Sequence, residues 1–395
     1  MKSKWNKVSL RHLISFISKG IAPVYAESET KTTIRVLNQK CNRNFQIRYS
    51  DSRLHDESKK RVPTDKYIKK YDILINSTGR GTAGRIAQIN NVPCKTIVDG
   101  HMIIIRANDQ VTQRYLGYAL KAHQQKVLQL DEGSTGQTEL DRERLLEEII
   151  ISYPESLDIQ KKIVALLERI DEKIELNNKI NDNLQQQAFA LFEQLLINAG
   201  DVECSVADIA HLNPKRALAK NQEAKCIEMS QLSTSGAFPS GWEKRLFTGG
   251  MRFSNGDTLL ARITPCLENG KAAFIDFLDT LEVAFGSTEY IVLASKGEVP
   301  PEFLYCLARY PAFSDYAVKN MNGSSGRQRV SAETIGQFKL PRPSTNELKR
   351  FGNAVSSLFL KMRFNSLENI CLSSLRDSLL PKLISGELDV SELDI

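Results

Sequence analysis

Two pairs of loops are rich in side chains that donate hydrogen bonds. Arg and Gln can form paired hydrogen bonds with guanine and adenine in the major groove of DNA, whereas Lys chiefly contacts phosphate. Each such residue alone is typical of an ordinary loop surface, but recurrence in both halves of the chain favours nucleic-acid recognition. The candidate DNA-binding residues are Arg80, Thr82, Arg85, Gln137 and Thr138 in the first half and Arg262, Thr264, Lys271, Arg327, Gln328 and Arg329 in the second.

Motifs of common catalytic and cofactor sites are missing from the sequence or stand in the wrong context. GRGTAG at residues 79–84 matches the dinucleotide fingerprint, but the sequence up to Pro93 does not suit the helix that this fingerprint requires, so we expect a turn between two strands. The chain has no GxxxxGK[ST] phosphate loop, no HExxH and no Asn/Asp-Pro-Pro-Tyr/Phe methyltransferase motif, and its histidines form no local ligand pair. The sequence therefore predicts no catalytic residue, no metal site and no cofactor.

A long helix near the middle of the chain organises the elements that carry these loops. Residues 159–197 contain neither Gly nor Pro, and apolar residues recur at alternating steps of four and three, which is typical of a coiled-coil seam. Close to forty helical residues would span about 60 Å. Such a one-sided helix requires a partner helix to cover its seam.

An internal repeat supplies that partner. Gly256-Asp257-Thr258-Leu259-Leu260 echoes Tyr71-Asp72-Ile73-Leu74-Ile75, and GSSGRQRV at 323–330 echoes GSTGQTEL at 133–140. A constant numbering offset, 351 − 163 = 188, carries the apolar seam of the first long helix onto apolar positions of a second, and it carries both seam asparagines onto asparagines. The predicted helix-pair seam consists of Ile163, Leu167, Ile170, Ile174, Asn177, Asn181, Leu184 and Leu191 with Phe351, Val355, Leu358, Met362, Asn365, Asn369, Leu372 and Leu379.

The repeat predicts a globule–helix–globule–helix chain of the α+β class. The expected parts are a first globule at 1–156, a central helix at 157–199, a second globule at 200–343 and a C-terminal helix and tail at 344–395. The two helices would form an antiparallel coiled coil with a pseudo-twofold axis, holding two α/β globules apart. Asparagines opposite one another would fix the register, although they could equally face solvent where the helices splay. We expect Pro381 to end or kink the second helix early.

Local patterns give a coarse assignment of the elements within the first globule. Residues 8–18 suit a short amphipathic helix, residues 112–128 suit a second one, and the segments near 69–76, 96–98, 102–105 and 149–153 read as strands. Outer helix faces carry apolar residues that would suit a partner protein, namely Val164, Leu176, Leu360 and Phe364.

Charge and composition bear on the partners of the chain and on its cellular compartment. Its 395 residues suffice for two or three domains. Residues 1–156 contain 26 Lys and Arg against 17 Asp and Glu, whereas residues 200–343 contain 16 of each kind. The basic first half suits nucleic acid, although such charge is also common on solvated surfaces. Scattered cysteines and the lack of a long apolar segment predict a cytoplasmic protein with reduced thiols and no membrane contact.

The chain resembles the specificity subunits of type I restriction-modification systems. The resemblance covers essentially the whole chain and is carried by the repeat, by KYDILI with its counterpart SNGDTLL, by the two Gly-Ser loops, and by LLPKLISGELDV at 379–390. It implies two target recognition domains, each reading one half of a bipartite site on double-stranded DNA. It further implies two methyltransferase subunits docked on the helices and restriction subunits with motor and nuclease activity, so that catalysis and its cofactors belong to these partners.

Two other functions remain open at the level of the sequence. One is a scaffold that binds proteins rather than DNA through two globules held apart by a coiled coil, for which the neutral second globule is the best support. The other is a single-chain enzyme that combines methylation with specificity, which the missing methyltransferase motifs and the limited length disfavour.

Overall fold

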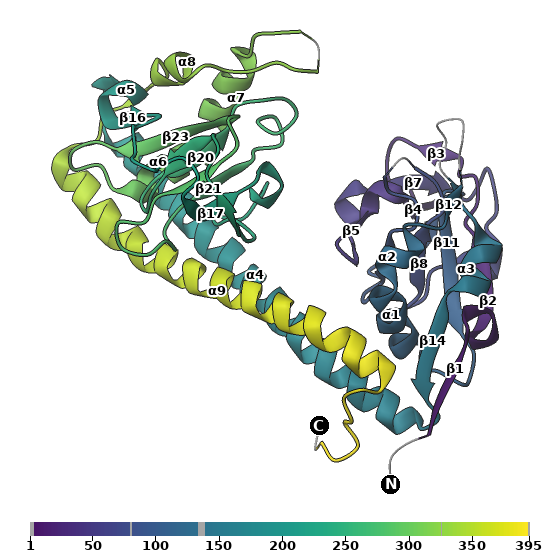
Figure 1. The fold of residues 1–395 in the computed structure, drawn as a ribbon. Helices are drawn as coiled ribbons and strands as arrows, with labels where there is room; N and C mark the ends of the chain where they lie inside the picture. Colours follow the sequence, from purple (N-terminus) through teal and green to yellow (C-terminus); the bar gives the residue numbers. More distant parts are fainter. Residues whose placement is uncertain (1–3, 80, 133–138, 325, 394–395) are drawn as a thin grey trace. The chain divides into compact units, whose positions relative to one another are not determined.

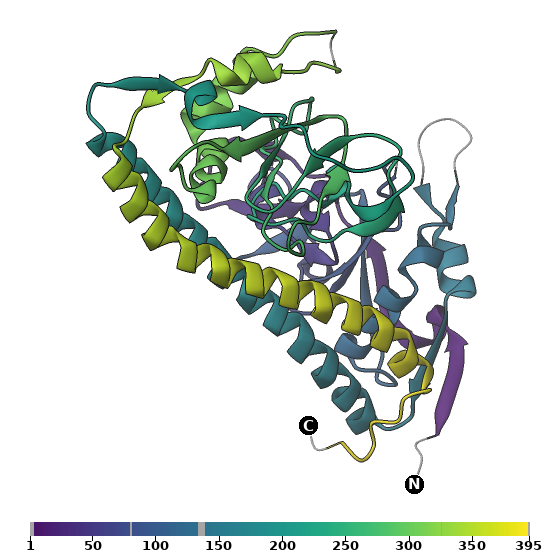
Figure 2. The ribbon, with the colours of Figure 1, turned by 60° about the vertical axis from the view of Figure 1, so that its left-hand side comes forward.

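The computed structural model describes residues 4–79, 81–132, 139–324 and 326–393. Its contacts divide the chain into two compact units: unit 1 comprises Met1–Asp171 and Ser374–Ile395, and unit 2 comprises Glu172–Ser373. Both views of the ribbon show the helices α4 (Leu157–Asn198) and α9 (Thr345–Ser385) side by side (Figures 1 and 2). Each unit therefore combines a globular part with a stretch of both long helices.

Unit 1 is built on an antiparallel sheet of order β2-β11-β8-β9 and a second sheet of order β10-β4-β7-β3, in which β10 and β4 are parallel. Strand β1 pairs with β14. The strands are β1 (Trp5–Ser9), β2 (Ile14–Lys19), β3 (Tyr25–Ala26), β4 (Thr33–Leu37), β5 (Asn42–Arg43), β6 (Gln46–Ile47), β7 (Arg53–Asp56), β8 (Ile73–Asn76), β9 (Ile86–Gln88), β10 (Thr96–Val98), β11 (Met102–Ala107), β12 (Asp131–Glu132), β13 (Glu139–Leu140) and β14 (Ile150–Pro154). The helices are η1 (Leu10–Leu13), η2 (Gln39–Cys41), η3 (Tyr49–Asp51), η4 (Thr64–Lys66), α1 (Gln113–Ala122), α2 (Gln124–Val127) and α3 (Arg142–Glu148).

Unit 2 repeats this plan. Its sheet β16-β23-β20-β21 is antiparallel, a second sheet has the order β18-β17-β22-β19 with β17 and β22 parallel, and β15 pairs with β24. The strands are β15 (Glu203–Ser205), β16 (Ala210–Leu212), β17 (Glu223–Ile227), β18 (Glu243–Leu246), β19 (Met251–Phe253), β20 (Thr258–Ala261), β21 (Ala272–Phe274), β22 (Ala284–Gly286), β23 (Tyr290–Ser295) and β24 (Lys339–Pro341). The helices are α5 (Val206–Ile209), η5 (Met229–Gln231), α6 (Pro301–Arg309), α7 (Pro311–Lys319) and α8 (Ala332–Gly336).

The internal repeat and the α+β class are thereby confirmed. The first residues of β11 and β23 differ in number by 290 − 102 = 188, and those of β8 and β20 by 258 − 73 = 185. Each pair of strands occupies the same place in its sheet. The central strands are buried along their lengths, as β8 and β20 show, because helices and the second sheet cover both faces.

The short helix expected at 8–18 is wrong. Strand β1 pairs with β14, the 3-10 turn η1 buries Leu10 and Leu13, and β2 pairs with β11. The apolar spacing of this segment fits a helix face, but pairing with two strands distant in sequence overrides the local pattern. The helix expected at 112–128 is confirmed, with a break at His123 between α1 and α2.

Helix α9 continues to Ser385, so the expectation that Pro381 ends it early is wrong. A proline in the last turns removes one backbone hydrogen bond. Leu380, Leu383 and Ile384 are buried in the same cluster as the core of unit 1, and this packing holds the final turn in place. The helix then ends beside Gly386, whose φ of +80° is a conformation that glycine adopts readily.

Most of the predicted seam residues are buried or half-buried. Ile163 and Leu167 belong to the core cluster of unit 1, and Phe351, Val355 and Met362 to that of unit 2. Ile170 is also buried, whereas Ile174, Leu184, Leu358, Leu372 and Leu379 are half-buried. The long helices therefore share their apolar faces with the globular cores.

Leu191 is a wrong assignment within the seam. Its side chain is 40% exposed, and the neighbouring Phe192 is 1% exposed and packs edge-to-face on Phe303. A helix with 3.6 residues per turn drifts away from a strict seven-residue repeat, so the buried face moves by one position near this end. Val164, expected on an outer face, is likewise buried against the core of unit 1.

The asparagines form a polar layer between the long helices in unit 2. Asn177 Nδ2 donates to Asn369 Oδ1 at 2.9 Å, Asn365 Nδ2 donates to Asn181 Oδ1 at 2.8 Å, and Asn181 Nδ2 donates to Ser366 Oγ at 3.2 Å. Partners descend along α9 as residues ascend along α4, so the helices are antiparallel here. Asn177 and Asn365 are 0% and 2% exposed, which rules out the solvent-facing alternative for these two.

An ionic network ties the long helices to α1 in unit 1. The Asp171 carboxylate accepts from Arg376 Nη1 at 2.9 Å and from the Tyr118 hydroxyl at 2.9 Å, and it lies 3.5 Å from Lys121 Nζ. Burial alone would raise the pKa of Asp171, but Lys121 and Arg376 lower it below its ordinary value. The carboxylate is therefore ionised at neutral pH and balances two cations.

We expect Asp171→Asn to destabilise the protein, because it leaves Lys121 and Arg376 without their shared counter-charge. Loss of one partner from a fully buried pair costs about 3–5 kcal/mol. Because Asp171 is 32% exposed, solvent screening reduces the expected loss in the free energy of unfolding to about 1–3 kcal/mol. Urea denaturation of the purified protein measures this loss.

Asp158→Asn is the matched control, since Asp158 is 83% exposed and contacts Lys161 on the surface of the same helix. Its effect should stay within about 0.5 kcal/mol. A lowered folded-state pKa stabilises the protein above the unfolded value of about 3.9 and loses this effect as pH falls through the lowered value. The gap between the wild type and Asp171→Asn should therefore shrink in acid; a constant gap would contradict the charge argument.

Candidate nucleic-acid interface

The turn predicted after β8 begins beside the last two residues of the 133–140 segment in unit 1. After β8, the Ser77 N–H donates to the His101 carbonyl at 2.8 Å, and the Ser77 carbonyl accepts from the Leu140 N–H at 2.7 Å. Thr78 and Glu139 form an antiparallel bridge. These backbone contacts hold the start of the turn that follows β8 beside Glu139 and Leu140.

Unit 2 forms the same contacts with different residues. The Arg262 N–H donates to the Glu289 carbonyl at 3.0 Å, the Arg262 carbonyl accepts from the Val330 N–H at 2.9 Å, and Ile263 bridges Arg329. We call this arrangement the loop corner. It comprises Ser77, Thr78, His101 and Glu139 in unit 1 and Arg262, Ile263, Glu289 and Arg329 in unit 2.

In unit 1, the structure describes only part of the predicted set. Arg85 is half-buried and donates from Nη2 to the Gly81 carbonyl at 3.2 Å, which closes the turn after β8. Thr82 lies half-buried in the same turn. Arg80, Gln137 and Thr138 lie outside the described residues. Arg85 thus uses one of its donors within its own loop.

In unit 2, the predicted residues differ in how far their side chains are engaged. Arg327 is exposed, and Gln328 accepts the Thr264 N–H through its carbonyl while its side chain is half-buried. Among the described residues, neither Arg262 Nε nor Thr264 Oγ1 has a hydrogen-bond partner. Lys271 instead donates to the Met229 carbonyl at 2.7 Å. Arg262 Nε and Thr264 Oγ1 are buried, so among these residues the exposed Arg327 offers donors to a ligand.

Arg329 is oriented by a residue that the sequence reasoning missed. Its Nε donates to Glu289 Oε2 at 2.9 Å and its Nη2 donates to Glu289 Oε1 at 2.7 Å. These bonds lower the pKa of Glu289, so the pair is ionised at neutral pH. Glu289 lies far from Arg329 in the sequence, and only its equivalence to His101 in the repeat, 289 − 101 = 188, gives a signal for it.

Part of the basic cluster between residues 59 and 70 serves the structure of unit 1. Lys60 Nζ donates to the Ala22 carbonyl and Lys66 Nζ to the Lys19 carbonyl, each at 2.8 Å. Lys59 Nζ lies 3.9 Å from Asp56. The surplus of basic residues in the first half is therefore only partly available to a partner.

The dinucleotide-like GRGTAG segment is a turn between strands, as expected. β8 and β9 pair antiparallel on either side of it, so the chain enters a strand rather than a helix. Gly84 has a φ of +81°, and a Cβ here would lie 2.8 Å from the Val127 carbonyl oxygen. Close packing against the end of α2 explains this glycine without a phosphate ligand.

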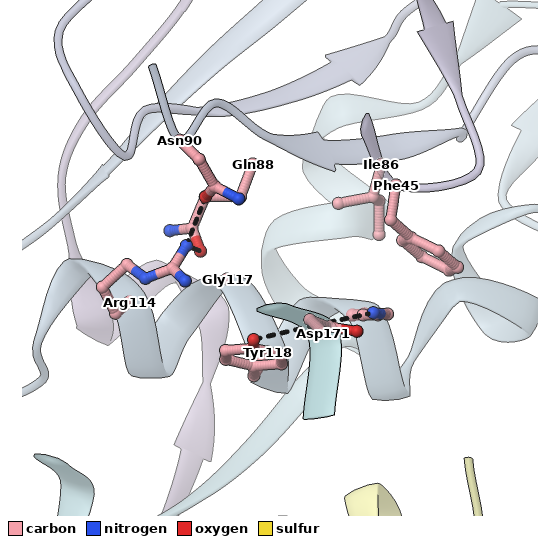
Figure 3. A pocket seen from close by; sticks show the side chains of 9 residues that line it. Phe45, Ile86, Gln88, Asn90, Arg114, Gly117, Tyr118 and Asp171 are labelled. Carbon is pink, nitrogen blue, oxygen red and sulfur yellow. Dashed lines mark hydrogen bonds and ion pairs between the residues drawn. The ribbon is translucent and has the colours of Figure 1, made fainter. Parts of the chain in front are cut away.

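A pocket in unit 1 is lined by residues that include Gln88, Tyr118 and Asp171 (Figure 3). Its volume is about 50 Å³, well below the ~300 Å³ at which ligand pockets begin. Arg114 Nη1 bonds to Gln88 Oε1 and Asn90 Oδ1 at 2.9 and 2.6 Å, so these lining groups satisfy one another. Within the described residues, there is no cluster of potential metal ligands and no helix long and apolar enough to cross a membrane.

The chain thus contains two repeated units, each with a loop corner of the same backbone contacts and different side chains. The model of the type I restriction modification DNA specificity domain matches residues 2–186. The specificity subunit of the type I restriction enzyme HindI from Haemophilus influenzae is 22% identical, covering 82% of this chain and 88% of that protein. The EcoEI specificity subunit from Escherichia coli is 27% identical over 62% of this chain and 43% of its own length.

A solved structure supports the fold over nearly the whole chain. The type I restriction-modification S subunit from M. genitalium aligns with a TM-score of 0.53 at 19% identity, covering 97% of this chain and 96% of that one. The chain is therefore similar over most of its length to specificity subunits of type I restriction enzymes. The domain matched in its first half is a DNA specificity domain.

We expect Arg327→Ala and Gln328→Ala to weaken binding of the assembled complex to its cognate DNA more than to unrelated DNA. A lost bidentate base contact costs about 1–3 kcal/mol of discrimination. Competition binding with cognate and scrambled duplexes measures the difference. An equal loss of affinity for every DNA sequence would instead indicate that these residues contact phosphate. Lys244→Ala, on an exposed side chain of β18, is the control, and Gln137→Ala with Thr138→Ala applies the same test to the first half.

Proposed function

We propose that each unit reads one half of an asymmetric, bipartite site on double-stranded DNA. The recurring loop corner carries this proposal, because the same backbone contacts present different side chains in the two units. A common frame with variable side chains suits two readers of different sequences. Arg262, Thr264, Arg327, Gln328 and Arg329 would contact the second half-site, and Arg80, Thr82, Arg85, Gln137 and Thr138 the first, with Lys271 nearer to phosphate.

The long helices would set the distance between the half-sites. Readers on one side of a duplex require half-sites about one turn, roughly 34 Å, apart. Helix α4 has 42 residues, which corresponds to about 60 Å, so the helix pair is long enough to act as a spacer. The polar asparagine layer would fix its register, since shifting either helix would leave a buried amide without its partner.

In this proposal the chain has four functional parts. Residues 1–156 and 200–343 are the two target recognition domains, and residues 157–199 and 344–395 are the spacer helices with the C-terminal tail. The loop corners belong to the first two parts, and the asparagine layer belongs to the last two.

The outer helix faces would dock two methyltransferase subunits, and restriction subunits would join the complex. Leu176 and Phe364 are 52% and 54% exposed, and they are equivalent in the repeat, since 364 − 176 = 188. Equivalent apolar residues on both helices suit two copies of one partner. Leu360, 45% exposed, extends this face on α9. Catalysis, with its cofactors, would belong to these partners.

A non-DNA scaffold is the alternative function, favoured by the balanced charge of residues 200–343. The salt dependence of binding separates the two. Contacts to phosphate release counterions, so the affinity of the complex for DNA should fall steeply with salt. A complex that shows no salt-dependent DNA binding would support the scaffold.

Sequencing the methylated sites in a host that expresses this chain with its cognate methyltransferase tests the main proposal. A single bipartite motif with an unspecified spacer is the expected result. Methylation without a bipartite motif would contradict it.

Removing residues 177–180 together with their repeat partners 365–368 should shorten the spacer. Four helical residues span about 6 Å, which corresponds to about two base pairs at 3.4 Å each. Both half-sites should remain unchanged, because the loop corners are untouched. The same sequencing measures the spacer, with the full-length chain as control. An unaltered spacer in an active variant would exclude the helices as the ruler.

A further inference from the structure

The two loop corners carry opposite charges at the same backbone position. Glu139 forms an antiparallel bridge with Thr78 in unit 1, and Arg329 forms one with Ile263 in unit 2. Thr78 and Ile263 directly follow Ser77 and Arg262, the residues that make the backbone hydrogen bonds of the two corners. Each charged residue has an oppositely charged neighbour, since Glu139 forms an ion pair with Lys19 and Arg329 with Glu289. The backbone contacts at this position are the same in both units, but the side chain is negative in unit 1 and positive in unit 2.

Both corner side chains remain accessible despite these pairs. Glu139 is 55% exposed and Arg329 is 38% exposed. An arginine has five N–H donors. Glu289 takes one from Nε and one from Nη2, and the Arg327 carbonyl accepts another from Nη1 at 3.2 Å. No described residue takes the remaining N–H on each terminal nitrogen, so both can serve a ligand, and the carboxylate holds the guanidinium in place.

The bases complementary to these two corners differ. Guanine presents two acceptors, N7 and O6, in the major groove, and a guanidinium with two remaining donors matches them. Cytosine presents the N4 amino donor, which a carboxylate accepts. Adenine also has an amino donor, but its adjacent N7 acceptor would repel a carboxylate. Charge reversal at one position thus selects between the two bases of a G·C pair.

We propose that residue 329 and its counterpart, residue 139, each determine one base of their half-sites: guanine opposite Arg329 and cytosine opposite Glu139. Glu289 is a positioning residue that orients Arg329. The proposal rests on the proposed function, since it assumes that each unit reads one half-site. It adds the base class at one position of each.

The test uses the full chain co-expressed with its cognate methyltransferase and reads the methylated motif. Glutamine suits adenine. Arg329→Gln should therefore replace or relax one guanine in one half-site and leave the other half-site unchanged. Glu139→Gln should alter one cytosine in the opposite half-site only. The expected loss of discrimination is about 5- to 150-fold, the equivalent of 1–3 kcal/mol.

Glu289→Gln and Arg245→Gln complete the series. Glu289→Gln keeps Arg329 but weakens its orientation, so it should relax the same guanine that Arg329→Gln affects. Arg245 also pairs with a carboxylate, Glu228, at 2.6 Å in unit 2, but on β18 rather than at the corner. Arg245→Gln should leave the motif unchanged. A merely structural role of the corner pair would alter the amount of active complex and not the identity of a base.

Binding supplies a second measurement for any variant that loses methylation. Competition between duplexes that carry each base pair in turn at every specified position gives base preference without catalysis. A bipartite wild-type motif that stays unchanged in Arg329→Gln and Glu139→Gln, or an equal loss of affinity for all duplexes, would overturn this inference and leave the proposed function intact. A wild-type motif that is not bipartite would overturn the proposed function itself.

Discussion

The mutual burial of the apolar faces of α4 and α9 is the interaction on which the rest of the structure depends. Neither helix could remain ordered alone, because a long one-sided helix in water leaves its apolar face uncovered. The faces also extend into both globular cores, with Ile163 and Leu167 in one and Phe351 and Val355 in the other. The helix pair is thus a continuation of both cores rather than a separate linker.

The two units have the same backbone contacts at the loop corner but different side chains there. Backbone hydrogen bonds at the loop corner are the same in both, because they depend on strand order and not on side chains. Side chains at the corner carry no share of the sheet pairing, so accessible ones are free to differ, as Glu139 and Arg329 do.

The repeat, the long helices and the fold class could be predicted because they rest on periodic patterns. The seven-residue apolar period marks a helix seam, and a fixed numbering offset of 188 marks a duplicated unit. Strand β2 could not be found this way, because its partner β11 lies some ninety residues away and its own spacing fits a helix. The sequence also could not show that Phe192 rather than Leu191 is the buried residue. Both are apolar, and the drift of the helix away from a seven-residue repeat determines which of them is buried.

The candidate site was predictable only in part, for a related reason. The polar loops are visible as composition, but which of their side chains are engaged depends on neighbours distant in the sequence. Lys271 bonds to the Met229 carbonyl, and Arg329 is held by Glu289. Such pairings arise from the order of strands in the sheets, and a short stretch of sequence does not reveal that order.

Unit 1 is built from the first and the last part of the chain, so its fold can be completed only at the end of protein synthesis. Its core takes Leu380, Leu383 and Val390 from beyond unit 2, so the globule made first is closed by residues made after the second. A chain released before these residues are made would leave part of this core exposed, and exposed apolar surface is a target for chaperones and proteases. The core of unit 1 is therefore complete only in a chain that extends through α9 and the residues that follow it.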